Sequence, residues 1–139
     1  MFRTALPENP LRIIALNRDV FFGIKLRNLA KELGYDLALV SGVPQLETGL
    51  ADHTATIALI VIDMNVLNQG VDWNALATAL QPHPEIPTLG FGSHTDVDER
   101  RSAKAIGLTR IVSNGDFHRN AAELIQRYAR VDESPDDAT

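Results

Sequence analysis

Five short apolar stretches, each followed by a segment with helical spacing, constrain the fold of this chain most strongly. The stretches cover residues 11–16, 35–40, 58–62, 88–91 and 108–112. They are nearly continuous in Ile, Leu, Val and Ala, which is typical of strands covered on both faces. Parallel neighbours need crossover connections, and these pack on the faces of the sheet. The alternation therefore predicts an α/β fold, a five-stranded parallel sheet in the order 2-1-3-4-5 with five helices.

Caps and glycines set the expected helix boundaries. Asp19 can cap the first helix, and Gly34 can end it. A weaker helix is expected around residues 45–51, where Gly49 lowers the helix propensity, followed by a loop through Gly70. The fourth helix is expected to begin at a cap, Thr95 or Asp96, and to run to Ala105, where Gly107 closes it. The apolar positions of the first, third and fifth helices are Phe22, Leu26, Leu29 and Leu33, then Trp73, Leu76 and Leu80, and finally Phe117, Ala121, Leu124, Ile125 and Tyr128.

The length of 139 residues suits one domain. We expect a non-helical lead-in at 1–10, the domain at 11–130 and a flexible acidic tail at 131–139. The chain has no cysteine, which excludes disulfides and thiolate chemistry. The first ten residues lack the apolar core of a signal peptide, and the longest apolar run, 57–62, is too short to cross a bilayer. A cytoplasmic protein without membrane contact is expected.

Charge argues against a general nucleic-acid binder. The formal net charge is −5, and the four acids of the tail account for most of it, which leaves −1 for the rest of the chain. A nucleic-acid-binding domain would show a strong basic excess. We therefore expect no direct contact with nucleic acid. The four acids are Asp132, Glu133, Asp136 and Asp137.

Polar residues follow the predicted strands at the points where the strands end. In folds of this kind, ligand sites lie outside the carboxyl ends of the strands. A functional site is therefore expected at that edge of the sheet. The residues there are Asn17, Arg18 and Asp19, then Asp63, Met64 and Asn65, then Gly92, Ser93 and His94, and finally Ser113, Asn114 and Gly115.

Over residues 11–130 the chain resembles the receiver domains of response regulators, the CheY-like superfamily. The likeness lies in an apolar first strand running into Asp19, the Gly34-Tyr35 junction, the 60–65 segment IVIDMN, and Ser93 after the fourth strand. The resemblance implies the flavodoxin-like, three-layer fold. It also implies that Asp63 is the phosphoacceptor, that Asn65 offers a carbonyl to a cation, and that Ser93 contacts a phosphoryl oxygen.

Three positions depart from the receiver pattern. Asn17 and Arg18 stand where the acids that hold Mg²⁺ belong, and Asn114 stands where a lysine belongs. An amide and a guanidinium cannot replace two carboxylates, and Arg18 would repel the cation. A slip of one residue would let Asp19 serve as a single ligand without restoring the pair. We hypothesise that Arg18 instead forms a permanent ion pair with Asp63.

The readout of phosphorylation is affected as well. Ile111 takes the place of the aromatic residue that usually reports phosphorylation in receivers, or Arg110 does if the register slips. His94 stands where receivers usually have a small residue, and it can partly close the site. Asp63 is therefore expected to be a vestigial phosphoacceptor, and the residues around it are expected to be the remains of a phosphorylation site. We expect no cofactor. Mg²⁺ is expected only if the phosphorylation site works.

Two enzymatic interpretations receive little support. Ser93, His94 and Asp96 suggest a hydrolase, but adjacent residues leaving a strand point in different directions, and no nucleophile elbow is present. His53, His83, His94 and His118 lack metal-ligand spacing, and no phosphate-binding loop occurs. We expect no enzyme, no catalytic residue and no metal.

The expected function is that of a stand-alone pseudo-receiver in signal transduction, acting by protein–protein interaction with phosphorylation impaired or absent. Its partner would be a protein or a component of a histidine kinase pathway, and a homodimer is possible. One alternative is a phosphorylatable single-domain response regulator that accepts phosphate on Asp63. Another is a small ligand-binding or enzymatic flavodoxin-like domain. By resemblance to receivers, the candidate interaction surface is the basic set Arg100, Arg101, Lys104, Arg110 and Arg119.

Overall fold

The computed structural model describes residues 11–53, 56–68, 72–93 and 95–130. The predicted lead-in, the predicted tail, Gly70 and His94 lie outside the described residues. Five parallel strands form one sheet in the order β2-β1-β3-β4-β5, as the sequence predicts. The strands are β1 (Arg12–Leu16), β2 (Asp36–Val40), β3 (Ile57–Asp63), β4 (Thr88–Gly92) and β5 (Arg110–Ser113).

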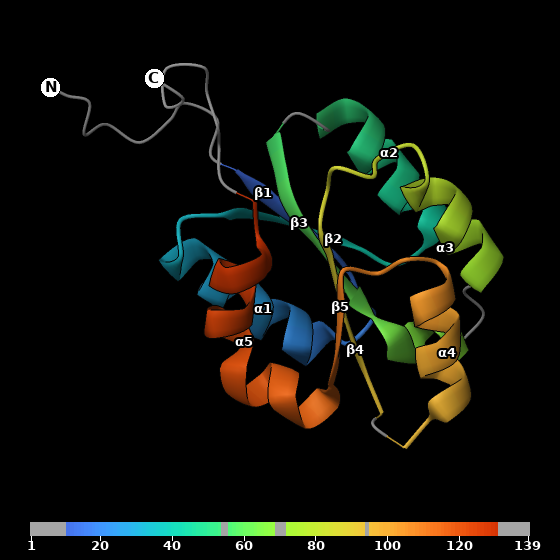
Figure 1. Ribbon diagram of the computed structural model, residues 1–139. Coiled ribbons are helices and arrows are strands. Elements are labelled where there is room, and N and C mark those ends of the chain that lie inside the picture. The colour runs from blue at the N-terminus through green and yellow to red at the C-terminus, as the bar shows by residue number, and fades with distance from the viewer. Residues whose placement is uncertain (1–10, 54–55, 69–71, 94, 131–139) are drawn as a thin grey trace, which may run out of the picture.

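Helices cover both faces of the sheet and complete the three-layer, flavodoxin-like fold. Figure 1 shows α1 and α5 on one face and α2, α3 and α4 on the other. Each helix returns the chain to the edge where the next strand begins, so the carboxyl ends of all five strands meet at one edge. The helices are α1 (Val20–Glu32), α2 (Val43–His53), α3 (Trp73–Leu80), α4 (Val97–Ala105) and α5 (Asn114–Tyr128), with a short 3-10 helix η2 (Met64–Asn68) after β3.

Capping side chains begin the helices where the sequence predicts. The Asp19 carboxylate accepts the Phe22 backbone N–H at 3.1 Å, and the Asp96 carboxylate accepts that of Glu99 at 2.9 Å. Asp96, and not Thr95, is therefore the cap of α4. Gly34 and Gly107 end α1 and α4 at φ values of 89° and 85°, a conformation that disfavours residues with a Cβ.

Strand β5 covers residues 110–113, where residues 108–112 are predicted, and two helix boundaries differ from the prediction for identifiable reasons. Helix α2 extends from Val43 to His53 and includes Gly49, which the sequence alone marks as a weak point. A Cβ on Gly49 would lie 3.2 Å from Ile14 Cδ1, so the glycine permits close packing of α2 on β1. Helix α5 begins at Asn114 because Ser113 caps it by accepting the Asp116 N–H at 3.1 Å.

The core has one apolar layer on each face of the sheet. Under α1 and α5, Phe91 and Phe117 stack with ring centroids 4.3 Å apart, and Phe22 packs at an angle against both. Both stacked rings are at most 2% exposed. On the opposite face, buried aliphatic side chains pack together under α2, α3 and α4. No helix in the described part of the chain is both long and apolar enough to cross a membrane.

Candidate functional site

A small cleft opens at the carboxyl edge of the sheet, at the predicted location. Its volume is about 210 Å³, and Asp63 lies in it at the end of β3 with only 6% of its surface exposed. Buried strand β3 fixes the position of Asp63, since all seven of its residues are buried. The residues that line the cleft are Arg18, Asp19, Asp63, Asn65 and Val66.

Asn65 supplies the hydrogen bonds that the Asp63 carboxylate accepts. Asn65 donates to Asp63 Oδ1 twice, from its backbone N at 3.0 Å and from its side-chain Nδ2 at 2.7 Å. The same Nδ2 donates to Asn114 Oδ1 at 3.3 Å. In the part of the chain that the structure describes, no lysine or arginine hydrogen bonds to Asp63 or forms an ion pair with it. The local partners of the carboxylate are therefore neutral.

Burial raises the pKa of Asp63 above its ordinary value of 3.8. The two hydrogen bonds from Asn65 lower the pKa, each by less than burial raises it. The nearby negative charge of Asp19 raises it further, and the positive charge of His118 lowers it. Asp63 is thus a carboxylate in an environment that disfavours its ionised form.

The end of β1 is occupied by a local turn. Asn17 Nδ2 donates to the Asp19 backbone oxygen at 2.8 Å, and the Asp19 N–H donates to Asn17 Oδ1 at 3.2 Å. The hypothesis of an Arg18–Asp63 ion pair is wrong: no such pair exists among the described residues. Arg18 Nε donates instead to the Ser41 backbone oxygen at 2.8 Å, because Ser41 follows the neighbouring strand β2.

These groups fit a Mg²⁺ ion poorly. Mg²⁺ requires oxygen ligands in near-octahedral geometry, and these usually include carboxylate oxygens that are free to bind it. Asp19 Oδ1 is already used as the cap of α1, and Arg18 lines the same cleft. Among the described residues, no group of three or more His, Cys, Asp or Glu side chains is placed to hold a metal ion.

His118 is the residue that the sequence did not point to. It lies in α5, with its ring edge-on to Phe22 at 5.0 Å between centroids, and its charge acts on Asp63. The strand order offers a signal, because α5 starts at the same edge of the sheet as Asp63. The amide of Asn114 stands at the first residue of that helix, where a lysine would be expected.

The structure does not bring every predicted residue into the cleft. The Ser93 hydroxyl lies 2.9 Å from that of Thr95 and accepts the Thr95 N–H at 3.3 Å, so it stabilises the turn before α4. Ser93 is not among the residues that line the cleft. Ile111 pairs with Gly90 in the sheet and is half-buried against the aliphatic layer.

Asp63→Asn is expected to stabilise the fold at pH 7 by about 0.5–2 kcal/mol. An asparagine oxygen can still accept both hydrogen bonds from Asn65, and the buried charge is removed. Because the folded pKa is raised, the folded state binds more protons than the unfolded state above pH 3.8, and stability falls as the pH rises. Urea unfolding of both proteins at several pH values measures this difference in stability.

The advantage of the variant should vanish below the ordinary aspartate pKa of 3.8, where Asp63 is protonated in both states. Asp72→Asn is the matched control, since Asp72 is an exposed cap on α3. A destabilising effect of Asp63→Asn at pH 7 would contradict a raised pKa of Asp63 in the folded state.

Structural comparison places the fold among receiver domains. The signal receiver domain of an HD domain-containing protein from Pseudomonas fluorescens superposes with a TM-score of 0.69 at 20% identity, covering 90% of this chain and 91% of that one. A CheY-like protein (tadZ) from Pseudomonas aeruginosa gives 0.67 at 19% identity, over 86% and 99% of the two chains.

The receiver domain of NtrX from Brucella abortus gives a TM-score of 0.69 at 15% identity, over 84% and 96% of the two chains. No protein-family model matches this chain, and no curated protein matches it in sequence. Identities at this level establish a common fold, and the function has to be argued from the residues of the cleft.

Proposed function

We propose that this chain, which has the fold of CheY-like receiver domains, is a pseudo-receiver that signals by binding a protein partner. The observation that carries the proposal is that both hydrogen bonds to Asp63 come from neutral groups of Asn65. Phosphoryl transfer places negative charge on the transferred oxygens, and cations must stabilise it. Here Asn65 and Asn114 form a chain of amides beside the carboxylate. Phosphorylation is therefore impaired or absent.

One observation favours the alternative, a phosphorylatable response regulator. Asp63 and Asp19 both line the cleft, so two carboxylates are available to a cation. Against this, one oxygen of Asp19 already accepts the cap hydrogen bond of α1, and Arg18 lines the same cleft, where it would repel a cation. This arrangement supports slow phosphorylation at most, and titration with beryllofluoride and Mg²⁺ separates the two functions.

The proposed partner-binding surface is a ridge on α1, formed by Val20, Phe21 and Ile24. These side chains are 71%, 86% and 55% exposed, and they are three of the four large exposed apolar side chains in the described residues. Clustered apolar exposure of this kind marks interaction sites. Val20 and Ile24 also line a groove of about 400 Å³ on the side of β2, and a second groove of about 370 Å³ lies further along α1, against α5.

The ridge and its flanking charges indicate the chemistry of the partner. A helix ridge beside a groove suits the packing of a partner helix. Arg18, Arg27 and Asp19 line the first groove, and Lys25, Arg119 and Glu32 line the second, so basic side chains outnumber acidic ones by one in each. The partner is therefore an amphipathic helical segment with acidic residues beside its apolar face. Two copies of this ridge would bring these cations together, which disfavours a homodimer through α1.

The basic set Arg100, Arg101, Lys104, Arg110 and Arg119 remains a second proposed surface. Two of its members pair with acids of their own helices, Arg101 with Asp98 at 3.7 Å and Arg119 with Asp116 at 2.8 Å. These pairs reduce the positive charge that the surface offers. We propose that it contributes less to binding than the ridge on α1. We also propose that the protein is cytoplasmic, that it is not an enzyme and that it does not bind nucleic acid directly.

Phe21→Asp is expected to lower capture of the partner by about 10-fold or more, because it places a charge at the centre of an apolar contact. The measurement is quantitative mass spectrometry of proteins retained from a cell lysate by the immobilised full chain. Val97→Asp is the matched control, since Val97 is 62% exposed on α4. Asp63→Asn should retain the same proteins as the unchanged chain.

Two outcomes would contradict the proposal. Equal retention by the Phe21→Asp and Val97→Asp variants would remove α1 as the surface. Retention that depends on Asp63, and that rises when a phosphodonor and Mg²⁺ are added, would replace a constitutive binder with a phosphorylation switch.

A further inference from the structure

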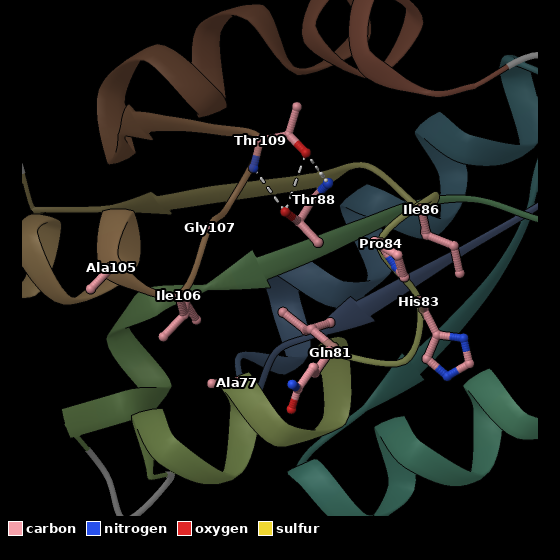
Figure 2. A pocket seen from close by; sticks show the side chains of 11 residues that line it. Ala77, Gln81, His83, Pro84, Ile86, Thr88, Ala105, Ile106, Gly107 and Thr109 are labelled. Atoms are coloured by element: carbon pink, nitrogen blue, oxygen red, sulfur yellow. Dashed lines mark hydrogen bonds between the residues drawn. The ribbon is translucent and has the colours of Figure 1, made fainter.

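The two edges of the sheet differ in how their backbone amides are used. At the amino edge, the Thr88 N–H donates to Thr109 Oγ1 and the Thr109 N–H donates to Thr88 Oγ1, both at 2.9 Å (Figure 2). At the carboxyl edge, the Gly115 N–H lies in the first turn of α5, where a helix offers no acceptor of its own. The cap, Ser113, accepts the N–H of Asp116 instead. No other described residue accepts the Gly115 N–H, so this nitrogen is available for chemistry.

An asparagine directly precedes this nitrogen, and Asn114-Gly115 is the only Asn-Gly pair in the chain. Gly115 is exposed and has no side chain to shield its nitrogen. The electrophile is the amide carbon of Asn114, whose Oδ1 accepts a hydrogen bond from Asn65 Nδ2 at 3.3 Å. A donor at this oxygen stabilises the negative charge that develops there during attack. A nucleophile and a polarised electrophile therefore lie on adjacent residues.

The reaction that joins them is the closure of a five-membered ring. The Gly115 nitrogen gives its proton to solvent hydroxide and attacks Cγ of Asn114. The new N–Cγ bond forms, the bond between Cγ and the side-chain nitrogen breaks, and that nitrogen leaves with a proton from solvent as ammonia. Water then adds to either carbonyl of the succinimide and opens it to aspartate or isoaspartate. One water is consumed and one ammonia is released, and no oxidant or reductant is needed.

Helical geometry slows this ring closure without preventing it. The backbone of Asn114 must leave the helical conformation, because a helix holds the side chain away from the next nitrogen. Asn114 is the first residue of α5, so the step opens the first turn, and loss of its cap bond slows closure by about 10-fold. Non-helical Asn120, at φ −124° and ψ 25°, separates this turn from the rest of α5. The opening is therefore local.

We propose that Asn114 deamidates spontaneously in the folded protein, and that the carboxylate formed adds a negative charge to the Asp63 site. Asn65 Nδ2 donates to both Asn114 Oδ1 and Asp63 Oδ1, so the new charge arises beside the existing one. The conversion is slow and irreversible, so the charge of the site changes with the age of the protein. The inference does not depend on the proposed function, because it needs only the local geometry.

Mass spectrometry of the full chain, aged in solution and digested with trypsin, tests the modification. Residues 111–119 form a peptide whose only asparagine is Asn114, and residues 120–127 form one whose only asparagine is Asn120. The first peptide should gain about 1 Da and separate into aspartate and isoaspartate forms. The rate should rise about 10-fold per pH unit, because the attacking nitrogen is deprotonated.

Asn120 is the matched control within the same helix. It is exposed and non-helical but is followed by alanine, so it should convert at least about 10-fold more slowly than Asn114. Gly115→Ala should slow conversion of Asn114 by a similar factor, because the added side chain shields the nitrogen. The new Cβ would lie 3.1 Å from Arg119 Nη1, the end of a flexible side chain that can move aside.

Three outcomes would overturn the modification site. They are equal conversion of Asn114 and Asn120, unchanged conversion in the Gly115→Ala variant, and conversion in urea without any in the folded chain.

Asn114→Asp, which reproduces the aspartate product, tests the effect on the cleft. The variant should raise the pKa of Asp63 further, because a second carboxylate nearby disfavours its ionised form. An NMR titration of the Asp63 carboxyl carbon measures this, and Asn120→Asp is the control that adds the same charge at an exposed position. An Asp63 pKa that is the same in the folded Asn114→Asp protein as in the wild-type chain would overturn the proposed effect on the site.

Discussion

Asn17→Asp, Arg18→Asp and Asn114→Lys in one chain are expected to raise the affinity for Mg²⁺ by about 100-fold. Two added carboxylates at the end of β1 would join Asp63 as oxygen ligands, and the repulsion from Arg18 would be removed. Asn114 Oδ1 lies 3.3 Å from Asn65 Nδ2, so a lysine at this position would begin beside the group that binds Asp63. The variant should then also bind beryllofluoride in the presence of Mg²⁺.

Calorimetric titration with Mg²⁺ measures the effect. Arg101→Asp is a suitable control, because it changes the net charge by the same amount at a side chain that is 77% exposed on α4. An affinity unchanged from the wild-type chain would show that the three departures are not what disables the site. Loss of the Asn17 turn with Asp19 is the structural cost of the substitutions, and circular dichroism checks it.

Phe117→Ala is expected to destabilise the fold by about 3–5 kcal/mol. Phe117 is fully buried, stacks on Phe91 and contacts Phe22, so its removal leaves a cavity beneath α1 and α5. A loss of this size is a large part of the total stability of about 5–15 kcal/mol that a domain has. Urea unfolding measures it through the midpoint and the slope.

Phe21→Ala is the matched control for the buried ring. Phe21 is 86% exposed, so the same substitution there should change stability by no more than about 0.5 kcal/mol. A similar loss for both variants would mean that Phe21 is also packed in the folded protein. That result would contradict the exposed ridge on α1, whereas a loss below about 1 kcal/mol for Phe117→Ala would contradict the aromatic layer.

The fold was predictable because hydrophobic periodicity specifies strands and helices, and short crossovers restrict their order. Position 49 shows a limit of this reasoning. A glycine lowers helix propensity, yet close approach to Ile14 favours it within α2. The helix boundary therefore depends on a tertiary contact that sequence spacing does not contain.

The cleft was predictable in location and only partly in detail. Topology places Asp63 and Asn65 at one edge of the sheet, and the structure has them there. The partner of Arg18 was not predictable, because it depends on where the backbone of Ser41 leaves β2. The effect of His118 on the pKa of Asp63 was not predictable either, because the two residues lie far apart in the sequence.

Titration of the wild-type chain with beryllofluoride and Mg²⁺, followed by amide NMR, tests the central claim most directly. Beryllofluoride stands in for the phosphoryl group on the Asp63 carboxylate. The amide environment of Asp63 predicts no saturable shift at Asp63, Asn65 or Asn114 under conditions that saturate the Asn17→Asp, Arg18→Asp, Asn114→Lys variant. Saturable, Mg²⁺-dependent shifts centred on Asp63 in the wild-type chain would contradict the account and identify a working phosphoacceptor.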